Sequence, residues 1–290
     1  MTAPGFDLLV HDSRRPWPVA PSSVHLVFGS PPYHGAGHKV GYDLYDYAPD
    51  LDQWLADLAA VTDQAYRALV AGGRLVVNVA NSGRKPYQDL AGETARIFTR
   101  AGFALRGQVI WDKGQHTAGT AWGSWHKASA PALRDCHEYL VIGQKGDKLD
   151  VTKWPARDDW QPGEFESLTL AIWRIQPESA KRAGHPAPFP VELARRLVRL
   201  YTCPGMTVLD PWAGSGTTAA AAISEGCHAL GYDLSAAYIE KARARASSSR
   251  VALTRPAGPD KQAITGDARN PHGSAEPPWT KSNTVPDLAL

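Results

Sequence analysis

Residues 207–218 read Thr-Val-Leu-Asp-Pro-Trp-Ala-Gly-Ser-Gly-Thr-Thr, and this stretch decides the fold. An apolar run ends at Asp210, Gly214 and Gly216 predict a tight turn, and the alanine-rich residues 217–223 predict a helix. A strand, a glycine loop and a helix in this order present backbone N–H groups and a helix N-terminus to a ligand. No Gly-Lys-Ser/Thr follows and a third glycine is missing, so neither a Walker loop nor a dinucleotide fingerprint fits.

A second acid indicates what kind of ligand the loop binds. Residues 229–234 predict the next strand, and Asp233 comes near its end, about 20 residues beyond the glycines. A carboxylate at this place suits a pair of ribose hydroxyls. The structural alternative for Asp233 is an N-cap of the helix expected at 235–246. We therefore expect a ligand that carries a ribose, and we see no feature built to hold a phosphate.

Three motifs together resemble one known family. The loop at 210–218 resembles the cofactor loop of amino-group DNA methyltransferases, which bind S-adenosyl-L-methionine, and Ser30-Pro31-Pro32-Tyr33 resembles their catalytic tetrapeptide. Residues 185–190, His-Pro-Ala-Pro-Phe-Pro, resemble the segment before the cofactor loop in the permuted (beta) group. The resemblance implies an α/β, Rossmann-like S-adenosylmethionine-dependent methyltransferase fold. It also implies a mostly parallel seven-stranded sheet with one reversed strand and a circularly permuted motif order.

The rest of the chain alternates strands with helices. This alternation predicts a mostly parallel sheet covered on both faces. No helix is expected between the strands at 104–112 and 137–144, so these two are expected to form an antiparallel pair. The expected strands are 6–10, 24–29, 74–80, 104–111 and 138–142, and the expected helices are 51–69, stopped by glycines 72 and 73, and 89–101.

Four regions follow from these patterns. Residues 1–144 form the catalytic half and residues 184–270 the cofactor-binding half of one methyltransferase domain. Residues 145–183 have weak periodicity and several Trp and Pro residues, which favours an inserted target-recognition region over an ordinary surface excursion. Residues 271–290 are expected to be a disordered tail, because the end of the chain is rich in Ser, Pro and Gly.

A short repeat bears on how the sheet is completed. Residues 11–16, His-Asp-Ser-Arg-Arg-Pro, echo residues 266–271, Gly-Asp-Ala-Arg-Asn-Pro. We interpret the two copies as the trace of a circular permutation by duplication and fusion, with coincidence as the alternative. Only one copy can lie beside the Asp233 strand, and the spacing to Ser30 favours Asp12 over Asp267 as the acid near the adenine.

The tetrapeptide suits transfer to an exocyclic amino group. Such a nitrogen is a poor nucleophile, and acceptors for its hydrogens help it to pyramidalise. The Ser30 hydroxyl and the Pro31 carbonyl are these acceptors, Pro32 stiffens the turn, and Tyr33 stacks on a base that has been flipped out of the duplex. Serine at the first position resembles the cytosine-N4 enzymes, whereas aspartate is commoner in adenine-N6 enzymes, which remain the alternative.

The resemblance also implies the residues that contact cofactor and DNA. Residues 120–138 resemble the segment between the last two strands of Ser-Pro-Pro-Tyr enzymes, and Glu138 is expected to be structural. The implied DNA-binding residues are Trp122, Ser124, Trp125, His126 and Lys127, with core packing and solvated surface as alternatives. The implied cofactor-binding residues are Asp12, Ser13, Pro186, Phe189, Asp210, Pro211, Trp212, Gly214, Ser215, Gly216, Thr217, Thr218 and Asp233.

Composition limits the partners. The chain has 290 residues and a net charge of only +2, so double-stranded DNA must meet a local basic face. The candidates for a phosphate track are Lys181, Arg182, Arg195, Arg196 and Arg199, with a solvated helix face as the alternative. A cognate restriction endonuclease is a further candidate partner, and a monomer and a homodimer are both open.

Cysteine usage and hydropathy limit the compartment. Cys136, Cys203 and Cys227 are widely spaced, which indicates neither a disulfide framework nor a metal site and favours the cytoplasm. No apolar stretch approaches membrane-spanning length. The rival functions are methylation of RNA and non-catalytic binding of S-adenosylmethionine or DNA.

Overall fold

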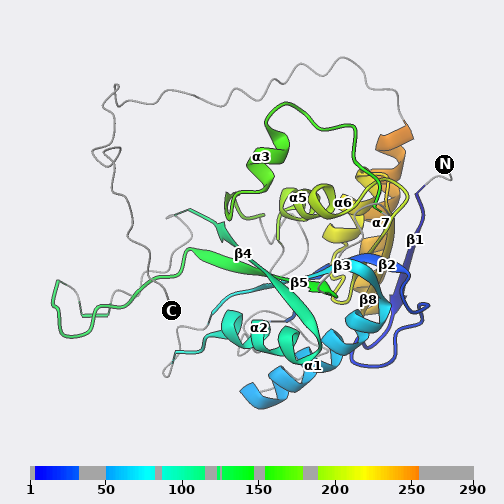
Figure 1. Cartoon of the computed structure of the whole chain (residues 1–290). Helices are drawn as coiled ribbons and strands as arrows, with labels where there is room; N and C mark the ends of the chain where they lie inside the picture. Colours follow the sequence, from blue (N-terminus) through cyan, green and yellow to red (C-terminus); the bar gives the residue numbers. More distant parts are fainter. Residues whose placement is uncertain are drawn as a thin grey trace, which may run out of the picture. The chain divides into compact units, whose positions relative to one another are not determined.

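An eight-stranded sheet forms the centre of the structure, in the order β1-β8-β7-β2-β3-β5-β4-β6 (Figure 1). The computed structural model describes residues 4–32, 50–81, 87–114, 123–124, 126–146, 154–178 and 189–254. These residues fall within one compact unit, Met1–Arg255. The strands are β1 (Phe6–Val10), β2 (Val24–Gly29), β3 (Leu69–Val79), β4 (Phe103–Asp112), β5 (His137–Lys145), β6 (Ile172–Arg174), β7 (Thr207–Asp210) and β8 (His228–Asp233).

Strand β5 alone runs against its neighbours in this sheet. It pairs antiparallel with both β3 and β4, whereas the other strand pairs are parallel. The predicted reversed strand is therefore confirmed. The predicted count of seven is wrong, because β6 adds a short edge strand that pairs Trp173 with Trp111 of β4. A strand of three residues is too short to leave an alternating pattern in the sequence.

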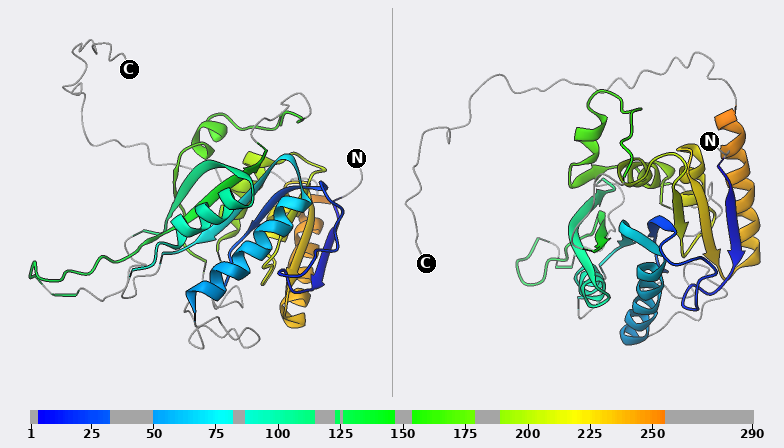
Figure 2. Two further views of the ribbon diagram at one scale, coloured as in Figure 1. Left: turned by 60° about the horizontal axis from the view of Figure 1, so that its bottom comes forward. Right: turned by 45° about the vertical axis from the view of Figure 1, so that its right-hand side comes forward.

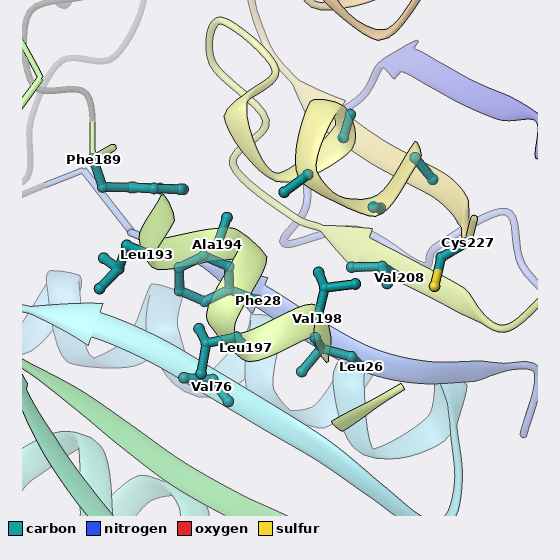
Figure 3. Packing of buried hydrophobic residues seen from close by; sticks show 14 of the residues in the cluster. Leu26, Phe28, Val76, Phe189, Leu193, Ala194, Leu197, Val198, Val208 and Cys227 are labelled. Atoms are coloured by element: carbon teal, nitrogen blue, oxygen red, sulfur yellow. The ribbon is translucent and has the colours of Figure 1, made fainter. Parts of the chain in front are cut away.

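Two layers of helices cover the sheet. On one face, α5 (Val191–Tyr201), α6 (Thr217–Ser224) and α7 (Ala236–Thr254) bury a core with side chains of β2, β3 and β7 (Figure 3). On the other face, α1 (Leu51–Ala68) and α2 (Leu90–Arg100) bury a second core. The strands separate these two groups of helices in Figure 2. The short helix α3 (Glu164–Leu168) contacts α5.

The edge between α1 and β3 differs from the prediction. Glycines 72 and 73 were expected to end the helix, but α1 already ends at Ala68 and β3 starts at Leu69. The pairing with β2 jumps from Leu69 to Arg74, so the glycines form an irregularity inside the strand. Gly72 has a φ of 80°, which suits such a bulge.

The parallel strands bring the predicted motifs to one edge of the sheet. Strands β1, β2, β7 and β8 are parallel, so their carboxyl ends lie together. β1 pairs with β8, from Phe6 opposite Ala229 to Val10 opposite Asp233. The prediction that the copy before Asp12 completes the sheet is thereby confirmed, and the copy at 266–271 lies outside the described residues.

The region 145–183 takes part in this fold through α3 and β6. Its assignment as a target-recognition region, and the other predicted region boundaries, stay predictions. Among the helices that the structure describes, none has the length and apolar character needed to cross a bilayer.

Candidate active site

The glycine loop joins β7 to α6 in a conformation that needs its glycines. Gly214 and Gly216 have φ angles of 48° and 82°. A Cβ on Gly216 would lie 2.6 Å from the Cα of Ala242, so α7 packs directly on the loop backbone. Gly216 also precedes the first turn of α6, where no side chain caps the helix. The loop thus presents backbone N–H groups at a helix N-terminus, as the sequence predicted.

Asp210 lies buried at the end of β7. Its residue is only 2% exposed, and its Oδ1 accepts a hydrogen bond from the Trp212 N–H at 2.9 Å. Burial raises the pKa of the carboxyl to about 7, and the nearby Asp233 acts in the same direction. A Cβ on Gly29 would come within 2.4 Å of the same Oδ1, so only glycine at the end of β2 leaves room for this carboxyl.

Asp233 fastens the glycine loop from the neighbouring strand. Its Oδ2 accepts from the Gly214 N–H at 2.9 Å, and its Oδ1 accepts from the Ser235 N–H at 2.8 Å. Burial raises the pKa of Asp233, against the effect of these N–H donors. The first turn of α7 is capped by the Ser235 hydroxyl, which accepts from the Tyr238 N–H at 3.3 Å. Asp233 is therefore not the N-cap, and the structural alternative for this residue is wrong.

The two acids make this edge suitable for a cation. Asp210 and Asp233 both have raised pKa values because they lose hydration, and Asp233 further raises the pKa of Asp210. A cationic ligand would favour their ionised forms. The expected cofactor carries a sulfonium and an ammonium group, so its charge fits the residues present.

Asp12 is already engaged by a guanidinium. Its Oδ1 accepts from the Arg14 Nε and its Oδ2 from the Arg14 Nη2, both at 2.9 Å. These hydrogen bonds hold the pKa of Asp12 below its ordinary value. The adjacent Ser13 is buried, and its carbonyl accepts from the Trp17 indole at 2.7 Å. Contacts of Asp12 and Ser13 with an adenine stay predictions.

The catalytic tetrapeptide is held by two other elements. The Ser30 hydroxyl donates to the carbonyl of Asn78, in β3, at 3.0 Å. Pro31 is buried, and the Pro32 carbonyl accepts from the Trp54 indole of α1 at 2.9 Å. The chain therefore leaves β2 in a fixed direction. Tyr33 lies outside the described residues.

A buried polar chain supports Ser30 from behind. The Asn78 amide donates to Glu138, which is 4% exposed and also pairs with Lys113. These contacts join β3 to the ends of β4 and β5. Glu138 holds other side chains in place, as its predicted structural role requires.

The remaining cofactor residues differ in their surroundings. Pro211 and Thr218 are buried in the loop and first helical turn, and Trp212 is partly exposed. Phe189 packs against Phe28 of the core, with ring centroids 5.0 Å apart, and its closure over a cofactor stays a prediction. Pro186 and His185 lie outside the described residues.

Arg245 of α7 is a contact that sequence reasoning missed. Its Nη1 donates to the hydroxyls of Thr217 at 3.0 Å and Ser215 at 3.4 Å, and its Nη2 reaches Glu178 at 3.4 Å. The hydroxyls of Ser215 and Thr217 therefore turn toward α7. No sequence signal marks Arg245, because the contact depends on how α7 packs beside the loop.

Two other missed residues had a weak signal. Gly29 directly precedes the tetrapeptide at the end of an apolar strand. Asn78 is a polar residue within an apolar run of β3, and it is 1% exposed. Small or polar residues inside buried strands are unusual enough to indicate a close approach or a specific hydrogen bond.

The predicted DNA-binding residues lie between β4 and β5. His126 and Lys127 are exposed, whereas the Ser124 hydroxyl donates to the Lys127 carbonyl at 2.7 Å and accepts from the Ala130 N–H at 2.9 Å. Ser124 therefore shapes the turn. Trp122 and Trp125 lie outside the described residues.

The proposed phosphate track on α5 is not formed. Arg195 and Arg196 pair with Glu192 at 2.9 Å each, and Arg199 is buried at 7% exposure, where it pairs with Glu164 and Glu225. Neither a phosphate track nor a solvated face describes Arg199. Lys181 and Arg182 lie outside the described residues.

Metal and disulfide chemistry find few candidates here. In the part of the chain that the structure describes, no group of three His, Cys, Asp or Glu side chains could hold a metal ion. The three cysteines are free thiols.

Comparison with known proteins gives one family. The family N6_N4_Mtase, described as DNA methylase, matches residues 24–244. The Type II methyltransferase M.MjaI from Methanocaldococcus jannaschii is 29% identical over 264 residues, which cover 78% of this chain and 86% of that protein. The DNA adenine methyltransferase YhdJ from Escherichia coli is 26% identical over 77% of this chain and 76% of its own length.

A solved structure shares the fold and holds a cofactor. The DNA modification methylase TTHA0409 from Thermus thermophilus, complexed with S-adenosyl-L-methionine, matches with a TM-score of 0.68 and 28% identity. The match covers 85% of this chain and 96% of that chain.

Proposed function

This chain belongs to the N6_N4_Mtase family of DNA methylases, and we propose that it transfers a methyl group from S-adenosyl-L-methionine to the N4 amine of cytosine in double-stranded DNA. The observation that carries the proposal is the hydrogen bond from the Ser30 hydroxyl to the Asn78 carbonyl at 3.0 Å. Because this bond uses the hydroxyl hydrogen, the lone pairs of Ser30 remain to accept a hydrogen from an exocyclic amine. The serine is thus set as an acceptor before substrate binds.

The glycine-loop edge holds the cofactor in this proposal. When bound, S-adenosylmethionine supplies a methyl group on a sulfonium, an electrophile that needs neither a metal nor a covalent enzyme intermediate. Asp210 and the loop at 214–218 hold the methionine part, Asp233 binds the ribose hydroxyls, and Asp12 receives the adenine amine. The buried acids also favour the positive charge of the cofactor.

The tetrapeptide orients the target amine. Ser30 and the Pro31 carbonyl accept its two hydrogens, which directs the nitrogen lone pair toward the methyl group, and Tyr33 stacks on the base. The hydrogen bond from Trp54 to the Pro32 carbonyl keeps the turn in place while the base enters. Because a paired base cannot reach these atoms, the target is flipped out of the duplex.

Serine at the first position of the tetrapeptide favours cytosine N4. The alternative is adenine N6, and the relative YhdJ is a DNA adenine methyltransferase. Both bases present an exocyclic amine, so the same acceptors serve either reaction. A restriction endonuclease as functional partner would follow from the likeness to the Type II enzyme M.MjaI.

The product identifies the target base. The purified full chain is incubated with unmethylated bacterial DNA and S-adenosylmethionine, and the nucleosides are identified by mass spectrometry. We expect N4-methylcytosine, and we expect Ser30→Ala to lower kcat by about 10²–10³ while cofactor affinity is kept. Ser23→Ala is the matched control, because its hydroxyl also donates to a carbonyl, that of Ala20 at 2.6 Å, at the opposite end of β2.

Each other product has a definite meaning. N6-methyladenine would overturn the choice of base and keep the roles of the tetrapeptide. Methylated RNA with unmethylated DNA would move the function to an RNA substrate. Cofactor binding without any methylated nucleoside would favour the non-catalytic alternative.

A further inference from the structure

The connection between β4 and β5 leaves the sheet at the catalytic edge. β4 is parallel to β3 and β5 is antiparallel, so the end of β4 and the start of β5 both lie at the carboxyl edge, where Ser30 follows β2. The Lys113 N–H donates to the Cys136 carbonyl at 2.8 Å and closes the base of the connection. In Figure 1 its described part, coloured green, extends well away from the sheet.

The base of the connection is tied to the catalytic serine. Lys113 pairs with Glu138, and Glu138 accepts a hydrogen bond from the Asn78 amide. The carbonyl of Asn78 in turn holds Ser30. A segment anchored in this way keeps a defined position relative to the tetrapeptide.

A compact turn preorganises the far part of the connection. Gly123 forms an antiparallel bridge with Pro131, and the Ser124 N–H donates to the Ala130 carbonyl at 2.8 Å. Gly123 has a φ of 68°, and a Cβ there would lie 2.3 Å from the Ala130 carbonyl oxygen. These contacts order the turn before any partner binds.

Leu133 stands out on this turn. Its side chain is 96% exposed, whereas the next most exposed large apolar side chains reach only 61%. Full burial of a leucine is favourable by about 1.5–3 kcal/mol, so this side chain gains most when a partner covers it. Nothing within the described chain does so.

The charge beside Leu133 fits a nucleic-acid backbone. Lys127 and Arg134 line an open hollow together with Leu133 and Pro131. Asp135 is the single acid among the described residues of 123–136. An exposed apolar side chain between cations matches stacked bases flanked by phosphates.

We infer that Leu133 enters the duplex beside the target base and fills the space that the flipped base leaves, while Lys127 and Arg134 contact the flanking phosphates. The inference rests on the proposed methylation of a base in duplex DNA. A flipped base leaves unpaired and unstacked neighbours, and an apolar wedge restores part of the lost stacking. Leu133 is a positioning residue, because it acts on the duplex and not on the reacting amine.

The test compares paired and mispaired targets. The methylated site is mapped by sequencing the product DNA, and two duplexes are made, one with the target base paired and one with it mispaired. A mispaired base is easier to extrude and needs the wedge less. We expect Leu133→Ala to lower kcat/KM at least about 10-fold on the paired duplex and no more than about 3-fold on the mispaired one.

Two variants serve as controls. Leu133→Met keeps an apolar side chain of similar length and is expected to remain close to wild type on both duplexes. Leu105→Ala removes a 46% exposed leucine at the opposite end of β4 and is also expected to have no effect. Because Leu133 is almost fully exposed, its loss does not disturb folding.

The outcomes are separable. Equal loss on both duplexes, or no loss on either, overturns the role of Leu133 while the proposed function stands. A wild-type protein that methylates neither duplex overturns the proposed function itself. A 2-aminopurine placed next to the target gives a readout without turnover: its fluorescence should rise with wild-type protein and rise less with Leu133→Ala.

Discussion

Gly29 shows how one missing side chain shapes the site. Strand β2 carries the catalytic serine directly after this glycine, and β7 carries the Asp210 carboxyl beside it. The two strands are neighbours, so a methyl group at position 29 would lie between catalytic and cofactor residues. A contact of 2.4 Å with Oδ1 and one of 3.0 Å with the Trp212 ring leave no room for it.

Gly29→Ala is expected to weaken cofactor binding and keep the fold. Overpacking costs about 1–3 kcal/mol, which corresponds to a loss of roughly 10- to 100-fold in affinity if the cofactor site takes the strain. Isothermal titration calorimetry with S-adenosylmethionine measures the change. Gly5→Ala is the control, because the nearest atom to its Cβ would be 3.7 Å away. Unchanged affinity in Gly29→Ala would show that the Asp210 side chain moves aside without consequence for the ligand.

Asp210 makes stability depend on pH. Its pKa is about 7 in the folded protein against an ordinary 3.8, so the folded chain retains a proton that the unfolded chain releases between these values. The contribution of this group is therefore largest below the ordinary pKa and is lost as the pH rises through the folded one. Asp210→Asn does not titrate and lacks this dependence.

Urea unfolding without cofactor at pH 4.5 and 7.5 measures the effect. We expect Asp210→Asn to gain stability relative to wild type by a few kcal/mol on going to the higher pH. Asp112→Asn is the opposite control, because Arg174 holds the pKa of Asp112 below its ordinary value. An Asp210→Asn difference that stays constant with pH would contradict the raised pKa.

At the scale of elements, α5 joins the sheet to the segment that contains α3. Arg199 of α5 contacts Glu164 of α3 and Glu225 after α6, and its guanidinium lies 5.2 Å from the ring centroid of Trp160. Arg157, also buried, shares Glu225 at 2.9 Å. This cluster of ion pairs fastens the segment 154–168 to the helix layer.

Removal of one buried partner should be costly. Arg199→Ala leaves carboxylates of the cluster without their main partner, and we expect a loss of about 3–5 kcal/mol in the free energy of unfolding. Arg195→Ala, one turn earlier on the same helix and 37% exposed, is expected to lose much less. Urea unfolding compares the two variants, and equal losses would argue against a buried cluster.

At the scale of the whole molecule, the N-terminal strand completes the sheet. β1 pairs along its length with β8, and all strands and helices that the structure describes end by Thr254. The compact unit ends at Arg255, and residues 256–290 form a separate unit. The acid at the adenine side is thus expected from Asp12 and not from Asp267.

Truncation tests this arrangement. A chain that ends at Arg255 is expected to keep the melting temperature and S-adenosylmethionine affinity of the full chain, whereas deletion of residues 1–15, which removes β1, is expected to abolish both. Thermal unfolding with and without cofactor gives the comparison. If the chain ending at Arg255 lost affinity, residues such as Asp267 would contribute to the site after all.

Some features were predictable because their signals are local. The strand, glycine loop and helix at 207–224 follow from an apolar run, two glycines and an alanine-rich stretch. The reversed strand followed from a strand pair with no helix between, and the choice of Asp12 over Asp267 for the sheet followed from spacing. Strand β6 and the bulge at glycines 72 and 73 were not predictable, because three residues carry no period and a bulge depends on its partner strand.

The sequence by itself determined which residues meet at the carboxyl edge, since each motif follows its own strand and parallel strands end together. Only the tertiary structure decided how these residues are held: Ser30 by the Asn78 carbonyl, Gly214 by Asp233, and Thr217 by Arg245. These bonds join segments far apart in the chain. Their geometry depends on the order and register of the strands and on the packing of α7, which no local pattern of residues specifies.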